Sequence, residues 1–163
     1  MDTDARRGLV ERIHASPVEL VLYVTGGGVL ALMDLLTTPG ASATVLDARV
    51  PYSATALHTL VGRPEGSVVS PEVARDLAEA ALDSARALGA NADALLLGVS
   101  CTAALTTTRD RRGADRAFVG IASAQGTAVA EVALDKDGDT RQAQDRIVSD
   151  AILLMLSRSA GQP

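Results

Sequence analysis

The sequence predicts a layered α/β domain with a mixed sheet and helices on both faces. In the first half of the chain, β-prone runs alternate with segments of helical periodicity. The run 94–99 is unbroken apolar sequence, which is typical of a strand covered on both faces. Two later strand-like segments are joined by a tight turn at Gln125-Gly126, which indicates a hairpin. Because 163 residues suit one domain, we expect a single domain over 1–163 with its core at about 18–158.

The first half of the chain alternates helices and strands. Leu9, Val10 and Ile13 share one helical face, and the next β-prone run ends at three consecutive glycines. Helical spacing returns directly after these glycines, so a strand, a glycine turn and a helix follow one another. A later helix ends where Gly62 and Pro64 interrupt it. We expect helix 4–14, strand 19–25, helix 29–36, strand 44–50 and helix 53–61.

The second half opens with the helix that the sequence marks most clearly. Ser70 is expected as its N-cap, Pro71 takes the first helical position, Glu72 lies in the first turn and Gly89 ends the helix. The buried strand that follows opens into a loop at 100–104, and a polar turn precedes the last helix. We expect helix 71–88, strand 94–99, strands 117–122 and 127–134, and helix 140–157.

Composition argues against nucleic acid and membrane partners. The net charge is −5 and the basic residues are dispersed, so the average field repels a phosphate backbone. Aromatic residues make up only 2% of the chain, which disfavours recognition by base stacking. No apolar stretch reaches membrane-spanning length. We therefore expect neither partner.

Cysteine and aliphatic content bear on compartment and assembly. Cys101 is the only cysteine, and the first twenty residues lack the pattern of a signal peptide, so we expect a cytoplasmic protein. A small chain that is 47% apolar and only 21% charged is expected to bury a helix face against its own copy, as a homodimer. No His, Cys or carboxylate cluster has metal-ligand spacing, so we expect no metal and no cofactor.

Three predicted loops carry small polar groups. They are 25–28, 40–42 and 100–104, and loops of this kind aim backbone N–H groups at ligands beyond the carboxyl ends of strands. Thr25, Gly26, Gly27, Gly28, Ser100, Cys101 and Thr102 are therefore candidate substrate-binding residues. A plain strand-to-helix turn explains the three glycines equally well, because neither phosphate-loop spacing nor a following Lys-Ser/Thr is present.

Two hydroxyl groups lie about one strand length apart in the sequence. Ser42 follows a glycine turn in Pro39-Gly40-Ala41-Ser42, and Tyr52 lies in Val50-Pro51-Tyr52-Ser53. We expect the two hydroxyls to converge at one edge of the sheet if the strand between them carries the chain back. A serine becomes a nucleophile only when a neighbouring group activates it. The pair is therefore the candidate catalytic centre.

Four segments together resemble the CinA C-terminal domain family. They are Thr25-Gly26-Gly27, Pro39-Gly40-Ala41-Ser42, Val50-Pro51-Tyr52-Ser53 and Gly98-Val99-Ser100-Cys101-Thr102-Ala103-Ala104, in the family's order. The resemblance spans roughly residues 20–156. It implies a three-layer α/β/α sandwich with a mixed, mostly parallel sheet, a dimer, and a pocket for a pyridine mononucleotide. Characterised members are nicotinamide-nucleotide amidases, which release ammonia from nicotinamide mononucleotide.

Carried over by position, the resemblance places the family nucleophile at Ser42 and its tyrosine partner at Tyr52. The family's lysine base, five residues after the tyrosine, is replaced by Leu57, which cannot accept a proton. His58 is adjacent in sequence, but neighbouring helical residues point about 100° apart, so it is either a substitute base or an ordinary helix residue. The segment 105–113 also departs from the family's glycine- and proline-rich loop. The chain thus resembles a divergent branch of the family.

Three further residues have two interpretations each. Arg141 and Arg146 match two family arginines in spacing, and one of them is a candidate phosphate ligand. An i,i+4 salt bridge with Asp145 is the alternative for Arg141. Cys101 is a second candidate nucleophile, but with only two histidines in the chain a buried structural thiol is the favoured interpretation.

Two classes of function remain open from the sequence. The first is a linear-amide hydrolase that acts on nicotinamide mononucleotide or a related pyridine nucleotide through Ser42 and Tyr52. The second is a pyridine-nucleotide-binding module that has lost the chemistry with the lysine, or a protein that performs a different reaction on a related nucleotide. The hydroxyl pair favours the enzyme, whereas Leu57 favours the module.

Overall fold

The computed structural model describes residues 1–63, 65–89, 91–108, 113–136 and 138–161. Its elements run in the order α1 (Thr3–His14), β1 (Val18–Thr25), α2 (Val29–Thr37), α3 (Ala41–Thr44), β2 (Val45–Arg49), α4 (Ala54–Val61), α5 (Pro71–Leu88), β3 (Leu95–Ala104), β4 (Arg116–Ser123), β5 (Gly126–Ala133) and α6 (Arg141–Ser159). The order of helices and strands follows the expectation, with one short helix added at α3. Ser53, Ser70 and Thr140 cap three helices through their hydroxyls.

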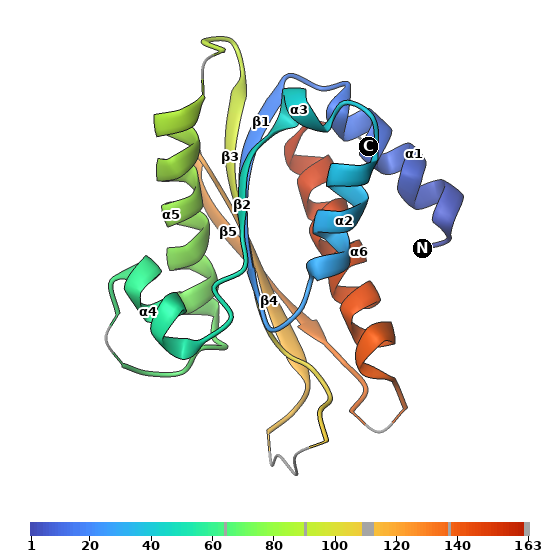
Figure 1. Cartoon of the computed structure of the whole chain (residues 1–163), viewed down its shortest axis with the longest axis vertical. Helices are drawn as coiled ribbons and strands as arrows, with labels where there is room; N and C mark the ends of the chain where they lie inside the picture. The colour runs from blue at the N-terminus through green and yellow to red at the C-terminus, as the bar shows by residue number, and fades with distance from the viewer. Residues whose placement is uncertain (64, 90, 109–112, 137, 162–163) are drawn as a thin grey trace.

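One five-stranded sheet in the order β2-β1-β3-β4-β5 forms the middle layer. β1 pairs in parallel with β2 and β3, while β4 pairs antiparallel with β3 and β5. Helices α1, α2 and α6 cover one face, and α4 and α5 cover the other (Figure 1). The mixed sheet and the three-layer arrangement are confirmed.

Strand β3 is longer than the sequence predicted. The apolar run was expected to end at Val99, with a loop over 100–104, but the strand continues to Ala104. The reason is tertiary: β1 pairs with β3 as far as Thr102, and β4 pairs with it from Gly98 to Ala104. Two strands therefore satisfy the backbone of a segment that lacks an apolar pattern. The predicted loop at 100–104 is wrong.

Helix α5 lies unusually close to the sheet because two glycines face it. A Cβ placed at Gly98 would meet the backbone carbonyl oxygen of Ala78 at 2.0 Å. Gly120 on β4 lies below the same helix, where an added Cβ would meet the carbonyl oxygen of Ala74 at 2.8 Å. Only glycine fits such a close approach between a helix and a strand.

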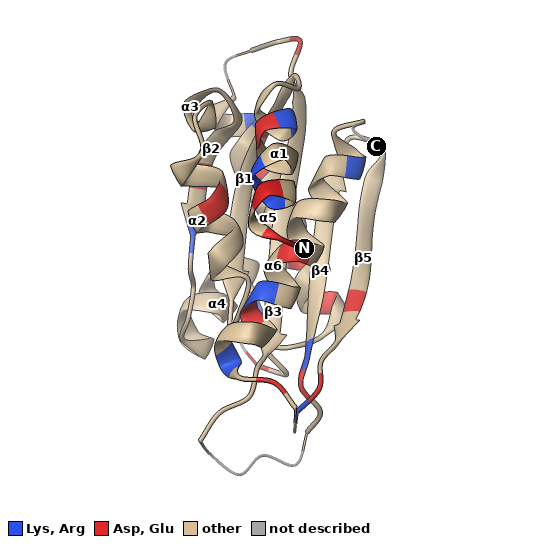
Figure 2. Cartoon of the chain, turned by 90° about the vertical axis from the view of Figure 1, so that its right-hand side faces the viewer, with Lys and Arg blue, Asp and Glu red and all other residues tan. Residues whose placement is uncertain are grey.

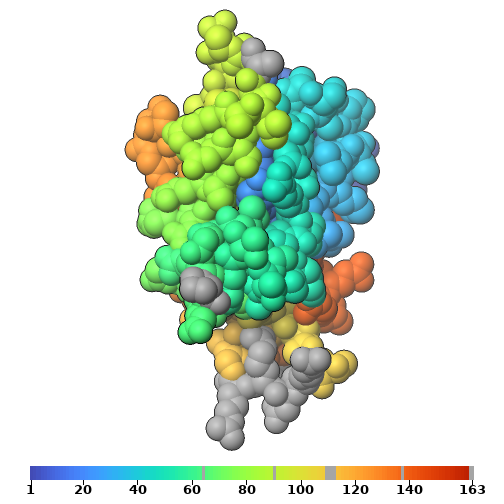
Figure 3. All heavy atoms as spheres, turned by 60° about the vertical axis from the view of Figure 1, so that its left-hand side comes forward, coloured from blue at the N-terminus to red at the C-terminus, as the bar shows by residue number. Residues whose placement is uncertain are grey.

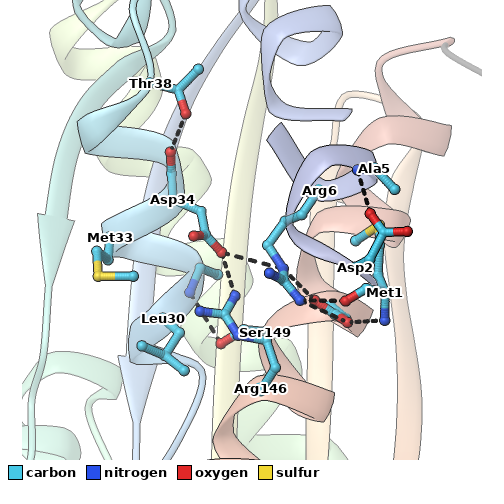
Figure 4. A network of polar contacts seen from close by, with 12 residues as sticks. Met1, Asp2, Ala5, Arg6, Leu30, Met33, Asp34, Thr38, Arg146 and Ser149 are labelled. Carbon is cyan, nitrogen blue, oxygen red and sulfur yellow. Dashed lines mark hydrogen bonds and ion pairs between the residues drawn. The ribbon is translucent and has the colours of Figure 1, made fainter. Parts of the chain in front are cut away.

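An ion-pair network ties α1, α2 and α6 together on the other face (Figure 4). Arg6 donates to Asp150 at 2.8 Å and lies 3.8 Å from Asp34, which also pairs with Arg146. Arg6 is 8% exposed, so its charge requires these partners. The hydrogen bond from Arg6 thereby helps to hold three helices in register. Figure 2 shows acidic and basic residues interspersed along the ribbons of these helices.

No helix of the described ranges is long and apolar enough to span a bilayer.

Candidate functional site

A pocket opens beyond the carboxyl ends of the parallel strands. It has a volume of about 680 Å³, within the roughly 300–1,000 Å³ range of small-molecule sites. Its polar lining comes from the end of β1, the end of β3, the segment after β2 and the start of α6. The lining includes Thr25, Gly26, Tyr52, Thr102, Thr107 and Arg141, and we call it the Tyr52 pocket. Ligands of open α/β sheets bind at this end of the strands.

Arg141 joins three parts of the pocket wall. Its Nη2 atom donates to the hydroxyl oxygen of Tyr52 at 3.0 Å and to the carbonyl oxygen of Gly26 at 3.1 Å. Its Nη1 atom donates to the carbonyl oxygen of Thr106 at 3.1 Å. A guanidinium has five N–H donors, so two remain for a ligand. Because Arg141 donates to the Tyr52 oxygen, the Tyr52 proton is also available to a ligand.

Gln144 fixes the wall behind Arg141 and was not singled out from the sequence. Its side chain is fully buried, and its carbonyl oxygen accepts from the backbone N–H of Thr106 at 2.6 Å. Its amide nitrogen donates to Asp115 at 2.9 Å and to the backbone oxygen of Asp135 at 3.0 Å. Gln144 thereby positions the peptide that Arg141 contacts. The sequence signal that could have identified Gln144 is its polar side chain on the otherwise apolar, buried face of the last helix.

The N–H groups at the end of the glycine turn and the start of α2 are occupied within the chain. Asp145 accepts from the backbone N–H groups of Gly28 at 2.8 Å, Val29 at 3.3 Å and Leu30 at 3.1 Å. Its carboxylate therefore occupies the N-terminus of α2, where an anion would otherwise bind. The salt bridge between Arg141 and Asp145, an alternative left open by the sequence, is not formed, because the two side chains bind different groups. The N–H groups of residues 28–30 are therefore occupied within the chain, whereas substrate binding by Thr25, Gly26 and Gly27 stays a prediction.

The glycines themselves serve close packing. Gly26 has φ of +77°, and an added Cβ would meet the carbonyl oxygen of Ala103 at 1.9 Å. Gly28 has φ of +85°, and an added Cβ would meet Ile152 at 2.6 Å. A side chain is excluded at both positions by conformation and by space. Of the three glycines, Gly26 lines the pocket through its backbone, while Gly27 packs against Leu105.

The polar residues of β3 are mostly occupied inside the fold. Ser100 is fully buried and donates to the carbonyl oxygen of Ala74 at 2.6 Å. Thr102 donates to the carbonyl oxygen of Val68 at the pocket wall. Burial, reinforced by nearby Asp145, raises the pKa of the Cys101 thiol, so the thiolate is disfavoured. Cys101 is a buried structural thiol, and Ser100 does not face the pocket.

Ser42 lies far from the pocket within one chain. It sits on α3, directly before β2 begins beside Leu20, whereas Tyr52 follows the end of β2 beside Tyr23. The five residues of β2 alone span roughly 16 Å at about 3.3 Å per residue. The expected convergence of the two hydroxyls does not occur within one chain, because β2 runs on and does not turn back (Figure 1). Both side chains are exposed.

The position of the missing lysine is part of the core. Leu57 is 1% exposed and packs with Tyr23 and Val21 under α5. His58 is half-buried and lies beside Gly62 and Arg63 in a separate hollow that shares no residue with the Tyr52 pocket. Its Nε2 atom is buried and has no hydrogen-bond partner among the residues that the structure describes. Where the resemblance implies a lysine base, this chain therefore has a core side chain.

A histidine that the sequence did not connect with Ser42 contacts its turn. A Cβ placed at Gly40 would meet the Cβ of His14 at 2.8 Å. His14 Nε2 lies 2.9 Å from the carbonyl oxygen of Leu35, which requires the proton to be on Nε2. Nδ1 is then the basic nitrogen, and no group in the described part of the chain forms a hydrogen bond with it. His14 and Gly40 are 26 positions apart in the chain, so no local sequence pattern indicated this contact.

Arg146 and the remaining candidates have structural partners. Arg146 pairs with Asp34 in the network of Figure 4 and lines neither part of the Tyr52 pocket. Within the described ranges, no group of three or more His, Cys, Asp or Glu side chains has the arrangement of a metal site. Of the atypical segment 105–113, residues 109–112 lie outside the described part. Thr106, Thr107 and Thr108 line an extension of the pocket beside Tyr52 and Arg141.

A second hollow lies at the other end of the sheet. It has a volume of about 390 Å³ and is lined mainly by the strand residues Leu95, Leu97 and Ile121 and by Met155 of α6. It lies at the amino ends of the parallel strands, and no charged side chain lines it. The Tyr52 pocket, which has convergent polar groups, is the better candidate site.

The fold relates this chain to proteins of known structure. No family model and no curated protein matches the sequence. Solved structures do match: the chain has the fold of the CinA, or competence- and damage-inducible, proteins.

The individual matches cover almost the whole chain. The CihA protein of Agrobacterium tumefaciens is 19% identical with a TM-score of 0.72, over 94% of each chain. The competence or damage-inducible protein of Enterobacter asburiae is 14% identical with a TM-score of 0.74, over 96% of each chain. A CinA superfamily protein of Escherichia coli is 16% identical with a TM-score of 0.67, over 97% of this chain and 90% of its own. The resemblance noted from the motifs is thus confirmed as a likeness of fold.

Proposed function

We propose that this protein is a CinA-type domain that binds nicotinamide mononucleotide or a related pyridine nucleotide in the Tyr52 pocket. One observation carries the proposal: Arg141 links Tyr52, Gly26 and Thr106 around one open pocket of about 680 Å³. This arrangement leaves donors on Arg141 and Tyr52 free for a ligand. Within one chain it supports binding better than hydrolysis, because Ser42 lies at the opposite end of β2.

The chemistry of the pocket suits such a ligand. The Tyr52 side chain is 64% exposed, so its ring face is open to a pyridinium ring. The free N–H groups of Arg141 match the oxygens of a phosphate. Threonine hydroxyl groups along the wall match the ribose hydroxyls.

Isothermal titration of nicotinamide mononucleotide tests the proposal. We expect saturable binding, weakened about tenfold in Arg141→Met, since one charge-assisted hydrogen bond contributes about 1.5 kcal/mol. Arg75→Met is the matched control, because Arg75 is an exposed arginine that donates to the carbonyl oxygen of Thr127 on β5. No binding, or equal loss in both variants, would refute the proposal.

A second candidate is hydrolysis of the carboxamide, favoured by the contact between His14 and the turn that carries Ser42. Ser42 Oγ would bond to the carboxamide carbon while its proton passes to a base and the carbonyl π electrons move to oxygen. His14 Nδ1 makes no hydrogen bond with Ser42 in the described chain, so the ring would have to turn toward Ser42 to serve as that base. Collapse would break the C–N bond, and ammonia would leave with that proton. Water would then cleave the seryl ester to give the nicotinic acid form and restore the serine.

Ammonia release from nicotinamide mononucleotide, measured beside Ser42→Ala, separates the two candidates. Release that is lost in the variant would establish a serine amidase. Binding without release would leave the nucleotide-binding module as the function. Release unchanged in Ser42→Ala would exclude Ser42 as the nucleophile.

We further infer that the protein is a cytoplasmic homodimer. The aliphatic composition supports self-association, and large apolar side chains are exposed on α2 and after β2. Light scattering that shows only a monomer at micromolar concentrations would contradict the dimer.

A further inference from the structure

The start of α6 contacts both ends of the glycine turn that follows β1. Arg141 and Asp145 are four positions apart, so they lie one turn apart on the same face of α6. Arg141 donates to the carbonyl oxygen of Gly26 at 3.1 Å, whereas Asp145 accepts from the backbone N–H of Gly28 at 2.8 Å. Consecutive Cα atoms are about 3.8 Å apart, so those of Gly26 and Gly28 are at most about 7.6 Å apart. The free N–H groups of Arg141 and the N-terminus of α2 are therefore neighbouring positions. Figure 3 shows the first turns of α6, in orange-red, at the surface directly below α2, in blue.

Helix α6 satisfies the N-terminus of α2 with two side chains. Asp145 accepts from the N–H groups of residues 28–30 through both of its carboxylate oxygens. The next N–H group, on Ala31, donates to the hydroxyl oxygen of Ser149 at 3.0 Å. Ser149 is fully buried, and its hydroxyl donates to Asp145 Oδ2 at 3.3 Å. The first N–H groups of a helix lack the carbonyl partners of later turns, and here four in succession bind side chains of α6.

The occupied position is the one where other open α/β folds hold a pyrophosphate. Such folds bind the pyrophosphate of a dinucleotide at the N-terminus of the helix that follows a glycine-rich turn. In this chain the carboxylate of Asp145 already supplies the negative charge at that place. A second phosphate would therefore find no free N–H group at the start of α2 and would lie next to a like charge.

Arg141 matches a single phosphate. Among the described residues that line the Tyr52 pocket and its extension, Arg141 has the only charged side chain. Three of its N–H groups are engaged within the chain, and the two that remain suit two oxygens of one phosphate. The described wall therefore offers a counter-charge to one phosphate group and offers no second cation to another.

We propose that Asp145 is a specificity-determining residue: its carboxylate fills the position of a second phosphate, so that the Tyr52 pocket accepts a nucleotide with one phosphate and rejects a dinucleotide. The selectivity arises from the loss of N–H donors and from charge repulsion. The identity of the nucleotide rests on the proposed function, whereas the filled position rests on the contacts of Asp145 within the chain.

Isothermal titration with two pyridine nucleotides tests the selectivity. We expect the wild type to bind nicotinamide mononucleotide at least about tenfold more tightly than nicotinamide adenine dinucleotide. Asp145→Asn keeps an acceptor oxygen for the α2 N–H groups but removes the charge, whereas Asp145→Ala also frees the N–H groups. The ratio of the two dissociation constants is therefore expected to fall in Asp145→Asn and to approach one in Asp145→Ala.

The ratio separates specificity from folding. A variant that is merely destabilised loses binding of both nucleotides alike, so its ratio stays at the wild-type value. Asp83→Asn is the matched control and is expected to keep that ratio, because Asp83 is an exposed carboxylate on α5 that pairs with Arg86. If Asp145→Ala does not fold at the assay temperature, Asp145→Asn decides. An unchanged ratio in Asp145→Asn, or equal binding of the two nucleotides by the wild type, would overturn the proposal.

Inorganic phosphate and pyrophosphate test the two neighbouring positions without a nucleotide. Thermal unfolding measures how much more pyrophosphate raises Tm than phosphate does at the same concentration. We expect this difference to be larger in Asp145→Ala than in the wild type, because one pyrophosphate then binds Arg141 and the freed N–H groups of α2 together. The enlargement is expected to disappear in the double variant Arg141→Met/Asp145→Ala, since the two positions share one ligand. A difference that is not enlarged in Asp145→Ala, or whose enlargement persists in the double variant, would overturn the proposal.

The two proposals fail separately. Binding of both nucleotides with equal affinity by the wild type would defeat only the role of Asp145. Binding of neither nucleotide would defeat the proposed function, while a pyrophosphate response that appears in Asp145→Ala and requires Arg141 would still support the filled position.

Discussion

The occupied N-terminus of α2 supports a sharp prediction at Asp145. Asp145→Ala removes a carboxylate that accepts from three backbone N–H groups at 2.8–3.3 Å. Loss of a cap costs about 0.5–2 kcal/mol, and loss of a charge at the helix dipole costs up to about 2 kcal/mol. We therefore expect a loss of about 2–3 kcal/mol, which lowers Tm by roughly 4–12 °C in a domain of this size.

The assay is thermal unfolding in the absence and presence of inorganic phosphate. In the wild type the helix terminus is filled, so any rise in Tm with phosphate comes from the pocket of Arg141 and is expected to disappear in Arg141→Met. In Asp145→Ala the freed N–H groups form an anion site, and phosphate is expected to raise Tm by mass action. Asp145→Asn retains an acceptor oxygen and is expected to lose about half as much stability.

A matched control separates this effect from general loss of charge. Asp83 is an exposed acidic residue that pairs with Arg86 one turn along α5. Asp83→Ala is expected to change stability by less than about 0.5 kcal/mol and to respond to phosphate as the wild type does. Equal stability of Asp145→Ala and wild type, or a rise in Tm with phosphate that is no larger in Asp145→Ala than in the wild type, would refute the assignment of Asp145 as the intramolecular anion.

Two further predictions concern the fold. Gly98→Ala is expected to lower the free energy of unfolding by at least about 1–3 kcal/mol in chemical denaturation, because its Cβ would meet the α5 backbone at 2.0 Å. Gly113→Ala is the control and is expected to be nearly neutral, because no described atom lies within 4 Å of the added Cβ. Equal stability of the two variants would contradict the packing argument. Burial raises the pKa of Asp150, but the hydrogen bond from Arg6 and the nearby positive charges outweigh it and leave the pKa below its usual value. Since a depressed carboxyl pKa stabilises the fold above the unfolded-state pKa, this contribution is lost as pH falls through the folded-state pKa. Asp150→Asn is therefore expected to unfold more easily at neutral pH and to show a shallower loss of stability in acid, measured by denaturation between neutral pH and acid; a wild-type pH profile in the variant would contradict it.

Local signals explain why most of the fold was predictable. The boundaries of α5 follow from Ser70, Pro71 and Gly89, whose capping roles depend only on neighbouring residues. The end of β3 could not be predicted in the same way. Its last five residues lack an apolar pattern, and they are held as a strand by β1 and β4, which come from distant parts of the chain.

The candidate site was only partly predictable for a related reason. Tyr52, Gly26, Thr25 and Thr102 line the pocket because each follows, or lies near, the carboxyl end of a parallel strand, which is a position the sequence indicates. The partner of the glycine turn is Asp145, more than one hundred positions away, and no local pattern identifies it. The position of Ser42 was missed because a strand that continues and a strand that turns back have the same sequence pattern.

The most direct test of the central claim is NMR mapping of nicotinamide mononucleotide binding to the isotope-labelled protein. The account predicts that amide shifts concentrate at Gly26, Thr102 and Thr106, while the capped amides of Gly28 and Leu30 stay unchanged. Shifts that concentrate at Gly28 and Leu30, or that avoid the Tyr52 pocket altogether, would contradict it.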